Sequence, residues 1–538
     1  MHTNQKGHGE QEHAIVSPYA PLRRRMFFWL WAAALTSNIG TWLQNVAAAW
    51  LMTSLNPSPF LVAMVQAVTT LPVFLLALPA GALADIVDRR RLLLAAQLWM
   101  LVAAGALAVL THNGMVTPSF LLLLTMALGA GFALNAPAWQ AVIPDLVPRA
   151  EVSAAVALNG VSVNISRAVG PAIGGALVAA FGAEAAFLLN ALSFIGVVVV
   201  LALWRNPVHN TPLPAERLWG AMWAGVRYVR HAPDFRLVLW RVTAFVTSAS
   251  ALLALLPAAS RLKFGDEATA YGLLLGCMGV GAVGGTLLLP SFQKRISAGA
   301  LIAIGSAIYA GGTIVVAYVA SFPAWCAAMI FVGAAWLILL TILSSASQAL
   351  LPRWVRARAL AVYILALYGG MAAGSAFWGA IADRIGISNA LALASVSTIV
   401  GSIVTARFRL PTGLENFEPS GHWPDAPPVS VLQYDNGPVL VIVEYRIDSS
   451  HEAEFRRVLG DLREIRLRDG ALRWDLFSNA ERPECFVEVF LVESWIEHLR
   501  QHERVTVADQ AVQERAKQLI VGPDLPRVTH LISQSNVR

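Results

Sequence analysis

Gln140-Ala-Val-Ile-Pro-Asp-Leu-Val147 decides the fold, because a related stretch, Gln348-Ala-Leu-Leu-Pro-Arg-Trp-Val355, returns about 208 residues later. A second pair, Gly175-Ala-Leu-Val-Ala-Ala-Phe-Gly182 and Gly379-Ala-Ile-Ala-Asp-Arg-Ile-Gly386, is separated by about 204 residues. A long internal repeat inside a hydrophobic chain is typical of secondary transporters, which are built from two related halves around a central site. The repeat therefore predicts two similar halves.

The composition points to lipid rather than water as the main solvent. The chain is 57% hydrophobic and 13% charged, with a mean hydropathy of +0.59, whereas about a quarter of the residues of a soluble protein are charged. The net charge of +6 comes mainly from arginines in short clusters between apolar runs, which is typical of membrane loops and not of a nucleic-acid-binding face.

The three cysteines, Cys277, Cys326 and Cys485, are too few for a disulfide framework or a metal site. We expect no metal and no cofactor.

A membrane-spanning helix needs about 20 mostly apolar residues, and twelve such runs can be placed. They predict an all-α membrane protein with twelve transmembrane helices in two six-helix pseudo-repeats. The predicted spans are residues 27–51, 60–84, 92–111, 119–143, 153–181, 184–204, 240–260, 271–290, 298–320, 323–350, 359–382 and 387–406.

The distribution of basic residues predicts the orientation. Arginines such as Arg89, Arg149 and Arg356 fall on one side of this arrangement, and only Arg261, Lys263 and Arg384 fall on the other. Basic loops lie in the cytoplasm. Both termini are therefore predicted to be cytoplasmic.

The other segments divide the chain further. Residues 205–239 link the halves and carry an amphipathic helix at the cytoplasmic surface. After a proline-rich linker, strand and helix patterns follow one another in the order β-α-β-β-α-β, which is ferredoxin-like. The predicted domains are a disordered cytoplasmic tail (1–25), a six-helix bundle (26–204), the first linker (205–239), a second six-helix bundle (240–408), the second linker (409–438) and a soluble cytoplasmic α+β domain (439–535).

The loop after the second predicted span is a candidate gate. It reads Gly81-Ala-Leu-Ala-Asp85-Ile-Val-Asp88-Arg89-Arg90-Arg91 and resembles the signature loop of the major facilitator superfamily, although that pattern usually has glycine where this chain has Asp88. Gly81 would let two helices approach closely, and a carboxylate at a helix end would meet arginines or a neighbouring helix N-terminus. Such a contact would lock one of two transport states; the alternative is a simple topology anchor.

The fifth predicted span holds two candidate features. Gly170, Pro171, Gly174 and Gly175 resemble the glycine-proline motif of exporters in the same superfamily, with ordinary small-residue packing as the alternative. Arg167 lies deep in the apolar run, where a charge needs a cavity or a partner. The residues predicted to line a central cavity with Arg167 are Asn38, Gln44, Asn135, Asn159 and Asn164, unless these amides pin helices together.

The coupling ion stays open at this point. No Asp or Glu lies in the middle of a predicted span, whereas many proton-coupled exporters titrate a buried carboxylate. A proton, if one is used, would have to be carried by a peripheral carboxylate such as Asp85 or Asp145.

Leu35-Thr-Ser-Asn-Ile-Gly-Thr-Trp-Leu-Gln44, Gly81–Arg91, Asn190-Ala-Leu-Ser-Phe194 and the Gly170-Pro171 segment together resemble the enterobactin-exporter-like (transmembrane secretion effector) branch of the major facilitator superfamily. The resemblance covers roughly residues 20–410. It implies a twelve-helix transporter of the bacterial inner membrane that exports siderophores, drugs or metabolites by alternating access. It implies a transporter and not an enzyme. Trp42, Trp50 and Trp139 are aromatic candidates for the cavity, or interface anchors.

The C-terminal domain resembles the dimeric α+β barrels of the antibiotic-biosynthesis-monooxygenase type. The resemblance rests on Val443-Glu-Tyr-Arg-Ile447, Gly470-Ala-Leu-Arg-Trp-Asp-Leu-Phe477 and Glu493-Ser-Trp495, followed by His498 and His502. It implies a homodimer of two transporters through this domain, or a domain that senses cargo at the cytoplasmic face, and relatives oxidise aromatic polyketides or bind haem. Trp474 and Trp495 could frame an aromatic pocket with a histidine as base or ligand, but packing roles are favoured. A catalytic or haem-binding domain fused to the transporter is the alternative reading.

Overall fold

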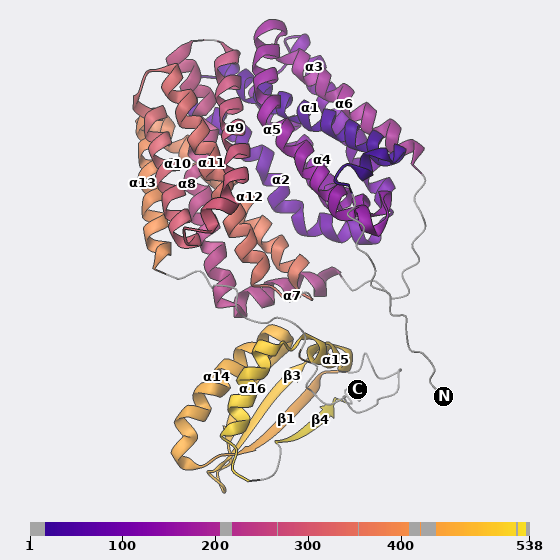
Figure 1. Ribbon diagram of the computed structural model, residues 1–538, viewed down its shortest axis with the longest axis vertical. Helices are drawn as coiled ribbons and strands as arrows, with labels where there is room; N and C mark the ends of the chain where they lie inside the picture. The colour runs from indigo at the N-terminus through magenta and orange to yellow at the C-terminus, as the bar shows by residue number, and fades with distance from the viewer. Residues whose placement is uncertain are drawn as a thin grey trace, which may run out of the picture.

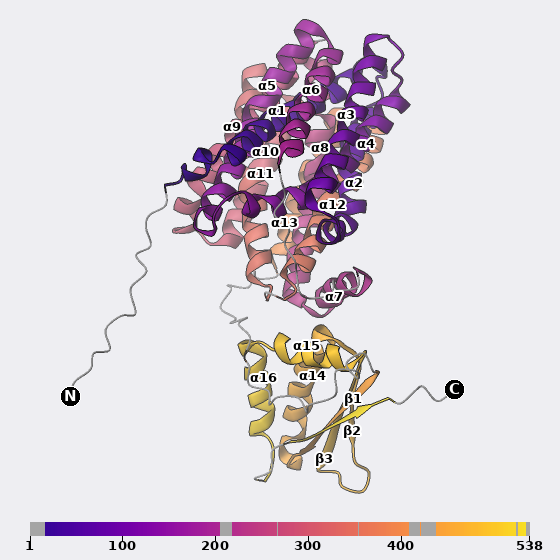
Figure 2. The same ribbon diagram turned by 90° about the vertical axis from the view of Figure 1, so that its right-hand side faces the viewer.

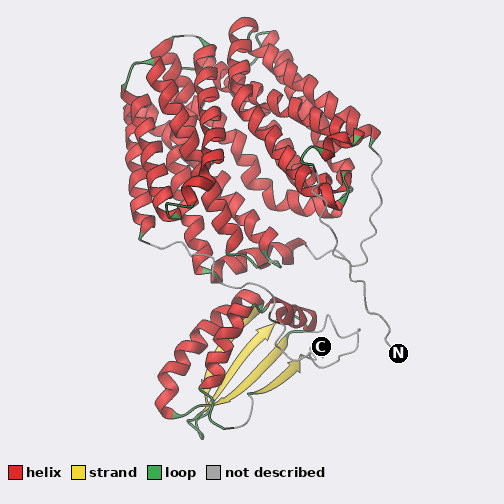
Figure 3. Ribbon diagram, in the orientation of Figure 1, coloured by secondary structure: helices red, strands yellow, loops and turns green. Residues whose placement is uncertain are grey.

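The computed structural model describes residues 17–204, 218–265, 267–352, 354–407, 420, 437–522 and 526–533. The predicted tail before residue 17, the first part of the first predicted linker (205–217) and most of the second predicted linker (409–419 and 421–436) lie outside this part. Two bodies are visible: a large bundle of helices and a smaller unit of helices and strands beneath it (Figure 1). Strands occur in the smaller unit alone among the described residues (Figure 3).

Six helices form the first half of the large bundle. They are α1 (Arg25–Leu55), α2 (Pro59–Ile86), α3 (Arg89–His112), α4 (Pro118–Val142), α5 (Val152–Phe181) and α6 (Ala183–Leu203). Several begin as the sequence dictates: the side chains of Ser58, Asp88 and Thr117 cap the N-termini of α2, α3 and α4. Asp88, which departs from the family pattern, thus accepts a hydrogen bond from the Arg91 amide at 2.9 Å and starts α3.

The second half follows the amphipathic helix α7 (Leu218–His231). Its helices are α8 (Pro233–Phe264), α9 (Ala268–Gln293), α10 (Ala298–Tyr318), α11 (Phe322–Ala349), α12 (Arg356–Ile385) and α13 (Ile387–Ala406). The longest difference from prediction is at α8, which begins at Pro233 instead of 240. Proline fits the first turn of a helix, and its fixed φ suits a start there.

The glycines that end the second repeated stretch make equivalent turns. Gly182 separates α5 from α6 with φ of +82°, and Gly386 separates α12 from α13 with φ of +86°. A side chain is strained in this left-handed region, and glycine is not. Each glycine therefore lets two long helices follow each other without a loop.

A helix occupies each of the twelve predicted ranges, but eleven of the described helices are long and apolar enough to cross a membrane. The helix α1 is not among them, because polar residues such as Asn38, Gln44 and Asn45 lower its hydropathy. Its role as a twelfth span, and the two-fold repeat of the bundles, stay predictions.

The smaller unit has a four-stranded antiparallel sheet. Its strands are β1 (Val439–Arg446), β2 (Ala471–Ser478), β3 (Cys485–Val492) and β4 (Arg527–Ile532), arranged in the order β2-β3-β1-β4. Its helices are α14 (Glu452–Asp469), α15 (Trp495–Arg504) and α16 (Val507–Gln518). Val505 separates α15 from α16, and a capping box on Thr506 starts α16.

The two central strands, β1 and β3, alternate in burial, which fixes one face of the sheet as the core. Val439, Val441 and Val443 of β1 are buried and belong to one cluster with Phe455 and Leu459 of α14. The even-numbered residues of β1 are half-buried or exposed. The helices thus cover one face of the sheet, as Figure 2 shows.

Candidate functional site

The two bundles are joined at the end of the molecule away from α7, which we call the outer end; the end that carries α7 is the inner end (Figure 1). At the outer end, the Ser58 hydroxyl at the start of α2 donates to both carboxylate oxygens of Asp383 at 3.0 Å, and the Phe60 amide donates to Asp383 at 3.2 Å. The helix N-terminus attracts this carboxylate. Asp383 therefore ties the end of α12 to the beginning of α2.

Two further contacts close the outer end. The Arg261 guanidinium at the end of α8 donates to the Thr53 hydroxyl of α1 at 3.2 Å. The rings of Trp50 and Tyr271 stack with centroids 6.2 Å apart. Trp50 of α1 thus contacts α9 of the second bundle at this end. The structure describes a state in which the outer end is closed.

The glycines of the predicted exporter motif on α5 contact two different helices. A Cβ atom added to Gly170 would lie 2.6 Å from the Trp42 Cβ, and one added to Gly174 would lie 3.1 Å from the Leu43 Cα, so both glycines admit α1 of the same bundle. Gly175 instead faces the second bundle, where an added Cβ would lie 2.7 Å from the Gly272 Cα of α9. Gly175 is therefore the member of the motif that lets the two bundles meet.

Pro171 completes this contact. It lies inside α5, and an added Cβ on Gly272 would come within 2.6 Å of the Pro171 carbonyl oxygen. Backbones approach this closely only where both helices carry small residues.

Two arginines of the predicted gating loop bond within the first bundle. The Arg89 guanidinium donates to Asp145 at 2.9 Å and to the Ala141 carbonyl at 3.2 Å. Arg90 donates to the Leu201 and Ala202 carbonyls at the end of α6. These bonds fasten the inner ends of α3, α4 and α6 together.

At Gly81 the structure differs from the expectation. A Cβ added to Gly81 would meet nothing within 4 Å, so the close helix approach expected there is not made in this state. The carboxylate that meets Arg89 is Asp145; the side chain of Asp85 lies outside the described part of the chain.

Three of the six predicted cavity residues bond inside the first bundle. Gln44 is buried and accepts a hydrogen bond from the Asn190 amide at 2.6 Å. Asn135 accepts from Gln97 at 3.0 Å, and Asn159 accepts from the Trp139 indole at 3.1 Å. These amides connect neighbouring helices.

The other three predicted cavity residues are half-buried. Asn38 and Asn164 form no side-chain hydrogen bond with another described residue. The Arg167 guanidinium lies close enough to the Tyr368 hydroxyl of α12 for an electrostatic interaction. Arg167 is thus the predicted cavity residue that the structure places against the second bundle.

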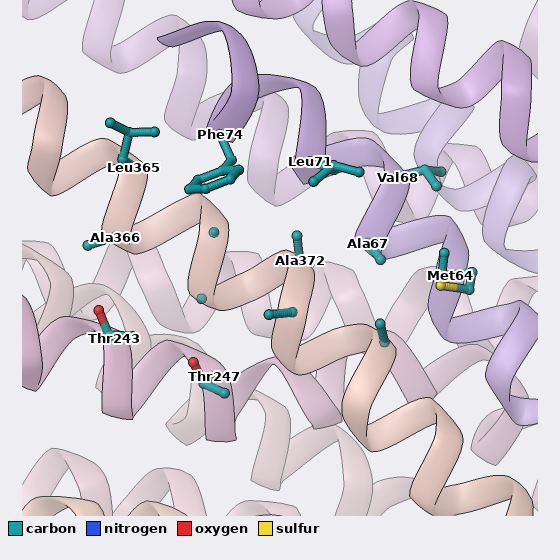
Figure 4. Close-up of a pocket in the computed structure, with 14 residues that line it drawn as sticks. Met64, Ala67, Val68, Leu71, Phe74, Thr243, Thr247, Leu365, Ala366 and Ala372 are labelled. Atoms are coloured by element: carbon teal, nitrogen blue, oxygen red, sulfur yellow. The ribbon is translucent and has the colours of Figure 1, made fainter. Parts of the chain in front are cut away.

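A cavity of about 560 Å³ lies between α2, α8 and α12, with walls from both bundles. Figure 4 shows the α2 side chains from Met64 to Phe74 opposite α12, with Thr243 and Thr247 on α8. The lining is almost wholly apolar; its remaining residues are Ala67, Val68, Leu71, Leu365, Ala366, Gly369, Gly370, Ala372, Ala373 and Ala376. Sequence reasoning missed this cavity, although the small residues at Gly369-Gly370 indicate a close approach: an added Cβ on Gly369 would lie 2.7 Å from the Phe74 ring.

The small α+β unit docks on the inner end of the second bundle. Glu497 of α15 pairs with Arg227 of α7 at 3.4 Å and with Arg504 at 2.5 Å, and the Arg504 guanidinium lies 4.6 Å from the centroid of the Trp354 ring. Burial alone would raise the pKa of Glu497, but Arg504 and then Arg227 hold that pKa below its ordinary value.

Two more features fit this docking contact. His231 of α7 lies 2.8 Å from the Glu464 carboxylate of α14. Gly470 ends α14 with φ of +140°, and an added Cβ there would lie 3.1 Å from both Arg504 and Glu497. Glycine is therefore required where the unit meets α7.

The aromatic and histidine candidates of the α+β unit contact other side chains of the same unit. The Trp474 indole donates to Glu488 at 2.9 Å, and Tyr445 and Arg466 donate to the same fully buried carboxylate. Trp495 is buried beside His498.

His498 is itself enclosed. It is 1% exposed, with its Nε2 3.3 Å from the His502 Nε2 and its ring beside His530. Burial, then His502 and His530, lower the pKa of His498 to about 3. A substrate or a haem iron cannot reach the His498 ring without rearrangement, so His498 does not fit the role of base or haem ligand in this state. Among the described residues, no group of three or more His, Cys, Asp or Glu could hold a metal ion.

Comparisons with known proteins agree with this architecture. The sequence profile of the family described as "transmembrane secretion effector" matches residues 16–538. Solved structures share the fold: a bacterial homologue of the human lysosomal transporter Spinster, inward-facing and unoccupied, has a TM-score of 0.56 at 15% identity and covers 74% of this chain and 96% of its own. A peptide transporter of the POT family has a TM-score of 0.58 at 14% identity, with 71% and 93% covered.

Curated relatives are transporters of small molecules. The staphyloferrin A transporter of Staphylococcus aureus is 26% identical over 260 residues, covering 48% of this chain and 65% of its own length. The enterobactin exporter of Salmonella choleraesuis is 28% identical over 253 residues, covering 46% and 59%. The multidrug efflux pump Tap of Mycolicibacterium fortuitum is 24% identical over 393 residues, covering 70% and 94%. The match thus spans from about half to just under two thirds of the length of the first curated relatives.

Proposed function

Because this chain belongs to the transmembrane secretion effector family of major facilitator transporters, we propose that it exports small amphipathic molecules across the bacterial inner membrane by alternating access. The observation that carries the proposal is the apolar cavity of about 560 Å³ whose walls come from both bundles, in a state with a closed outer end. A site between two halves that part and rejoin can face each side of the membrane in turn. The related siderophore and drug exporters support this class of cargo.

The inner end is proposed to be cytoplasmic, with both chain termini on that side. The basic clusters at Arg89–Arg91 and around Arg356 lie at the inner end, together with α7. Basic loops remain in the cytoplasm.

We further propose that export is driven by proton antiport through a peripheral carboxylate. Asp145 is the described candidate, because its ion pair with Arg89 at 2.9 Å would break when the carboxylate is protonated. Loss of this pair would remove one of the two bonds by which Arg89 fastens the inner end of α4 to α3.

Inside-out membrane vesicles test both proposals. The vesicles contain the full chain and a pH-sensitive dye, are energised to acidify their interior, and receive siderophores, lipophilic drugs and aromatic metabolites one at a time. We expect at least one compound to enter only the vesicles that hold the chain, and to release part of the proton gradient as it enters. Uptake that persists after the gradient is collapsed would contradict proton coupling. No uptake of any compound would contradict export.

The α+β unit is proposed to be a ferredoxin-like domain that joins two copies of the transporter. Its sheet face away from the helices carries Leu440 and Ile442 of β1, Val487 and Val489 of β3, and Phe477 of β2, as the strand registers place them. Phe477 is 53% exposed. A second copy of the same face is the occupant that makes an isologous contact. That contact would cover the apolar residues, which Glu444, Arg473 and Asp475 flank on the same face.

Replacement of Phe477 by Asp should convert the full-length dimer in detergent to a monomer, because a charge in an apolar contact is left without a partner. The mass of the protein-detergent complex, corrected for bound detergent, measures this. Val507→Asp is the matched control, because Val507 is 38% exposed on α16, away from the open sheet face. Equal masses of the two variants would show that the sheet face is not the contact.

A further inference from the structure

Arg167 is the most isolated charge in the membrane helices. It is the sixteenth of the 30 residues of α5. In α1–α6 and α8–α13, no other Asp, Glu, Lys, Arg or His lies more than ten residues from both ends of its helix. A charge at this depth costs several kcal/mol unless it faces a partner or a polar cavity. Arg167 therefore needs a counter-ion or a polar surrounding at this depth.

The protein does not supply that counter-ion in the described part of the chain. No described carboxylate lies within ion-pair distance of Arg167. The Tyr368 hydroxyl of α12, in the second bundle, interacts electrostatically with the Arg167 guanidinium. A guanidinium and a phenol are both hydrogen-bond donors, so together they form a site for an acceptor with negative charge.

Arg167 also lies where the two bundles meet. An added Cβ on Gly279 of α9 would come within 2.6 Å of the Ala168 Cα, so α9 passes directly against this turn of α5. Arg167 therefore has α9 and α12 of the second bundle as neighbours. A group bound there touches both halves and is released when they part.

Residues that follow Tyr368 on α12 line the apolar cavity. Tyr368 directly precedes Gly369 and Gly370, which line the cavity between α2, α8 and α12. A molecule with an anionic group at Arg167 and Tyr368 would have an apolar surface beside it for its remaining atoms.

We propose that the cargo is an amphipathic anion, whose carboxylate or other anionic oxygen group binds Arg167 and Tyr368 and whose apolar part occupies the cavity lined by Phe74. This inference deepens the export function proposed above and rests on it. The planar fork of arginine suits bidentate binding of an oxyanion. It also accounts for the absence of carboxylates from the middle of the membrane helices, because a fixed anion would compete with the cargo.

Three isosteric probes separate charge from shape: 2-naphthoate, neutral 2-naphthamide and cationic 2-naphthylmethylammonium. Binding to the purified full chain in lipid nanodiscs is followed by quenching of tryptophan fluorescence, with the unsubstituted protein and Arg167→Gln, Arg167→Lys and Tyr368→Phe. We expect 2-naphthoate to bind at least about tenfold more tightly than the other probes, and Arg167→Gln to remove that preference. Arg167→Lys should keep part of it, because the charge stays and the fork is lost.

The variants also test whether Arg167 is only structural. If Arg167→Gln fails to fold, Arg167→Lys and Tyr368→Phe decide the question, since both should weaken 2-naphthoate binding and leave 2-naphthamide binding unchanged. Equal affinity for the three probes, or equal affinity of all variants for 2-naphthoate, would overturn the proposal.

Transport of the same probes in the inside-out vesicles keeps the two proposals distinct. Uptake of the three naphthyl probes at equal rates would leave export standing and overturn the anion site. Arg167-dependent binding without uptake of 2-naphthoate or any other compound would support the anion site and overturn export.

Discussion

Replacement of Gly175 by Leu is expected to lower export at least about fivefold, while the protein still folds and inserts. Gly175 and Gly272 allow α5 and α9 to meet with no room for a Cβ atom on either residue. Overpacking of a tight contact costs about 1–3 kcal/mol, which corresponds to a shift of roughly 5- to 150-fold in a two-state equilibrium. The cost falls on the outer-closed state, because that contact joins the two bundles and not the helices of one bundle.

The readout is the access of a membrane-impermeant thiol reagent to Cys introduced in place of Tyr271, after the three native cysteines are replaced by Ser. Tyr271 is 5% exposed beside Trp50 when the outer end is closed. We expect fast labelling from the outer side in the Gly175→Leu background and slow labelling without it. Gly196→Leu on α6 is the matched control, because an added Cβ there meets nothing within 4 Å. Labelling that is equally slow in both backgrounds would rule out a closing role for Gly175.

Acidification is expected to destabilise the C-terminal α+β unit strongly between about pH 6.5 and pH 3. An unfolded imidazole binds a proton below about pH 6.5, whereas the pKa of folded His498 is about 3. Unfolding therefore takes up a proton in this window, and the free energy of unfolding falls as the pH falls. It is fully restored above pH 6.5. The free energy of unfolding is about 5 kcal/mol lower at about pH 3 than above pH 6.5. This loss is comparable with the whole stability of a small domain.

Amide hydrogen exchange of β1 and β3 in the full-length protein measures this effect, after correction for the intrinsic pH dependence of exchange. His498→Phe, which removes the titrating group, should flatten the pH profile over the same window. His451→Phe is the control, because His451 is exposed before α14. A profile as steep in His498→Phe as in the unsubstituted protein would assign the acid sensitivity to other groups.

Helix positions could be predicted from the sequence because apolar runs of membrane length leave little freedom. The helix α1 differs from the others, because polar residues around Asn38 and Gln44 lower its hydropathy. Its assignment as a membrane span therefore depends on the family resemblance and on its packing. In the α+β unit, the alternation along β1 and the turn at Val505 give the element order directly.

The cavity could not be predicted in the same way. A polar residue such as Gln44 or Asn159 indicates that its helix face contacts a polar group. The sequence does not show whether that group belongs to a neighbouring helix or to the contents of a cavity. In the structure, Gln44 bonds to Asn190 and Asn159 bonds to Trp139. The residues that do line the cavity, such as Phe74 and Leu365, are of ordinary type in apolar runs. Only tertiary packing brings α2, α8 and α12 together there.

Arg167 could be predicted from the sequence as a candidate site residue, but its partner could not. Its charge within α5 marks it from the sequence alone, because charges deep in a membrane are costly. Its partner Tyr368 lies about 200 residues away on α12, outside any local pattern.

Alternating access is tested most directly by two distances measured in lipid nanodiscs by pulsed electron paramagnetic resonance. One spin-label pair joins Ser54 and Arg384 at the outer end, and the other joins Gln140 and Gln348 at the inner ends of α4 and α11; all four residues are exposed. Introduction of Gly175→Leu should lengthen the outer distance and shorten the inner one, because closing one end requires opening the other. An outer distance that lengthens while the inner distance stays the same or also lengthens would contradict a rocking transporter.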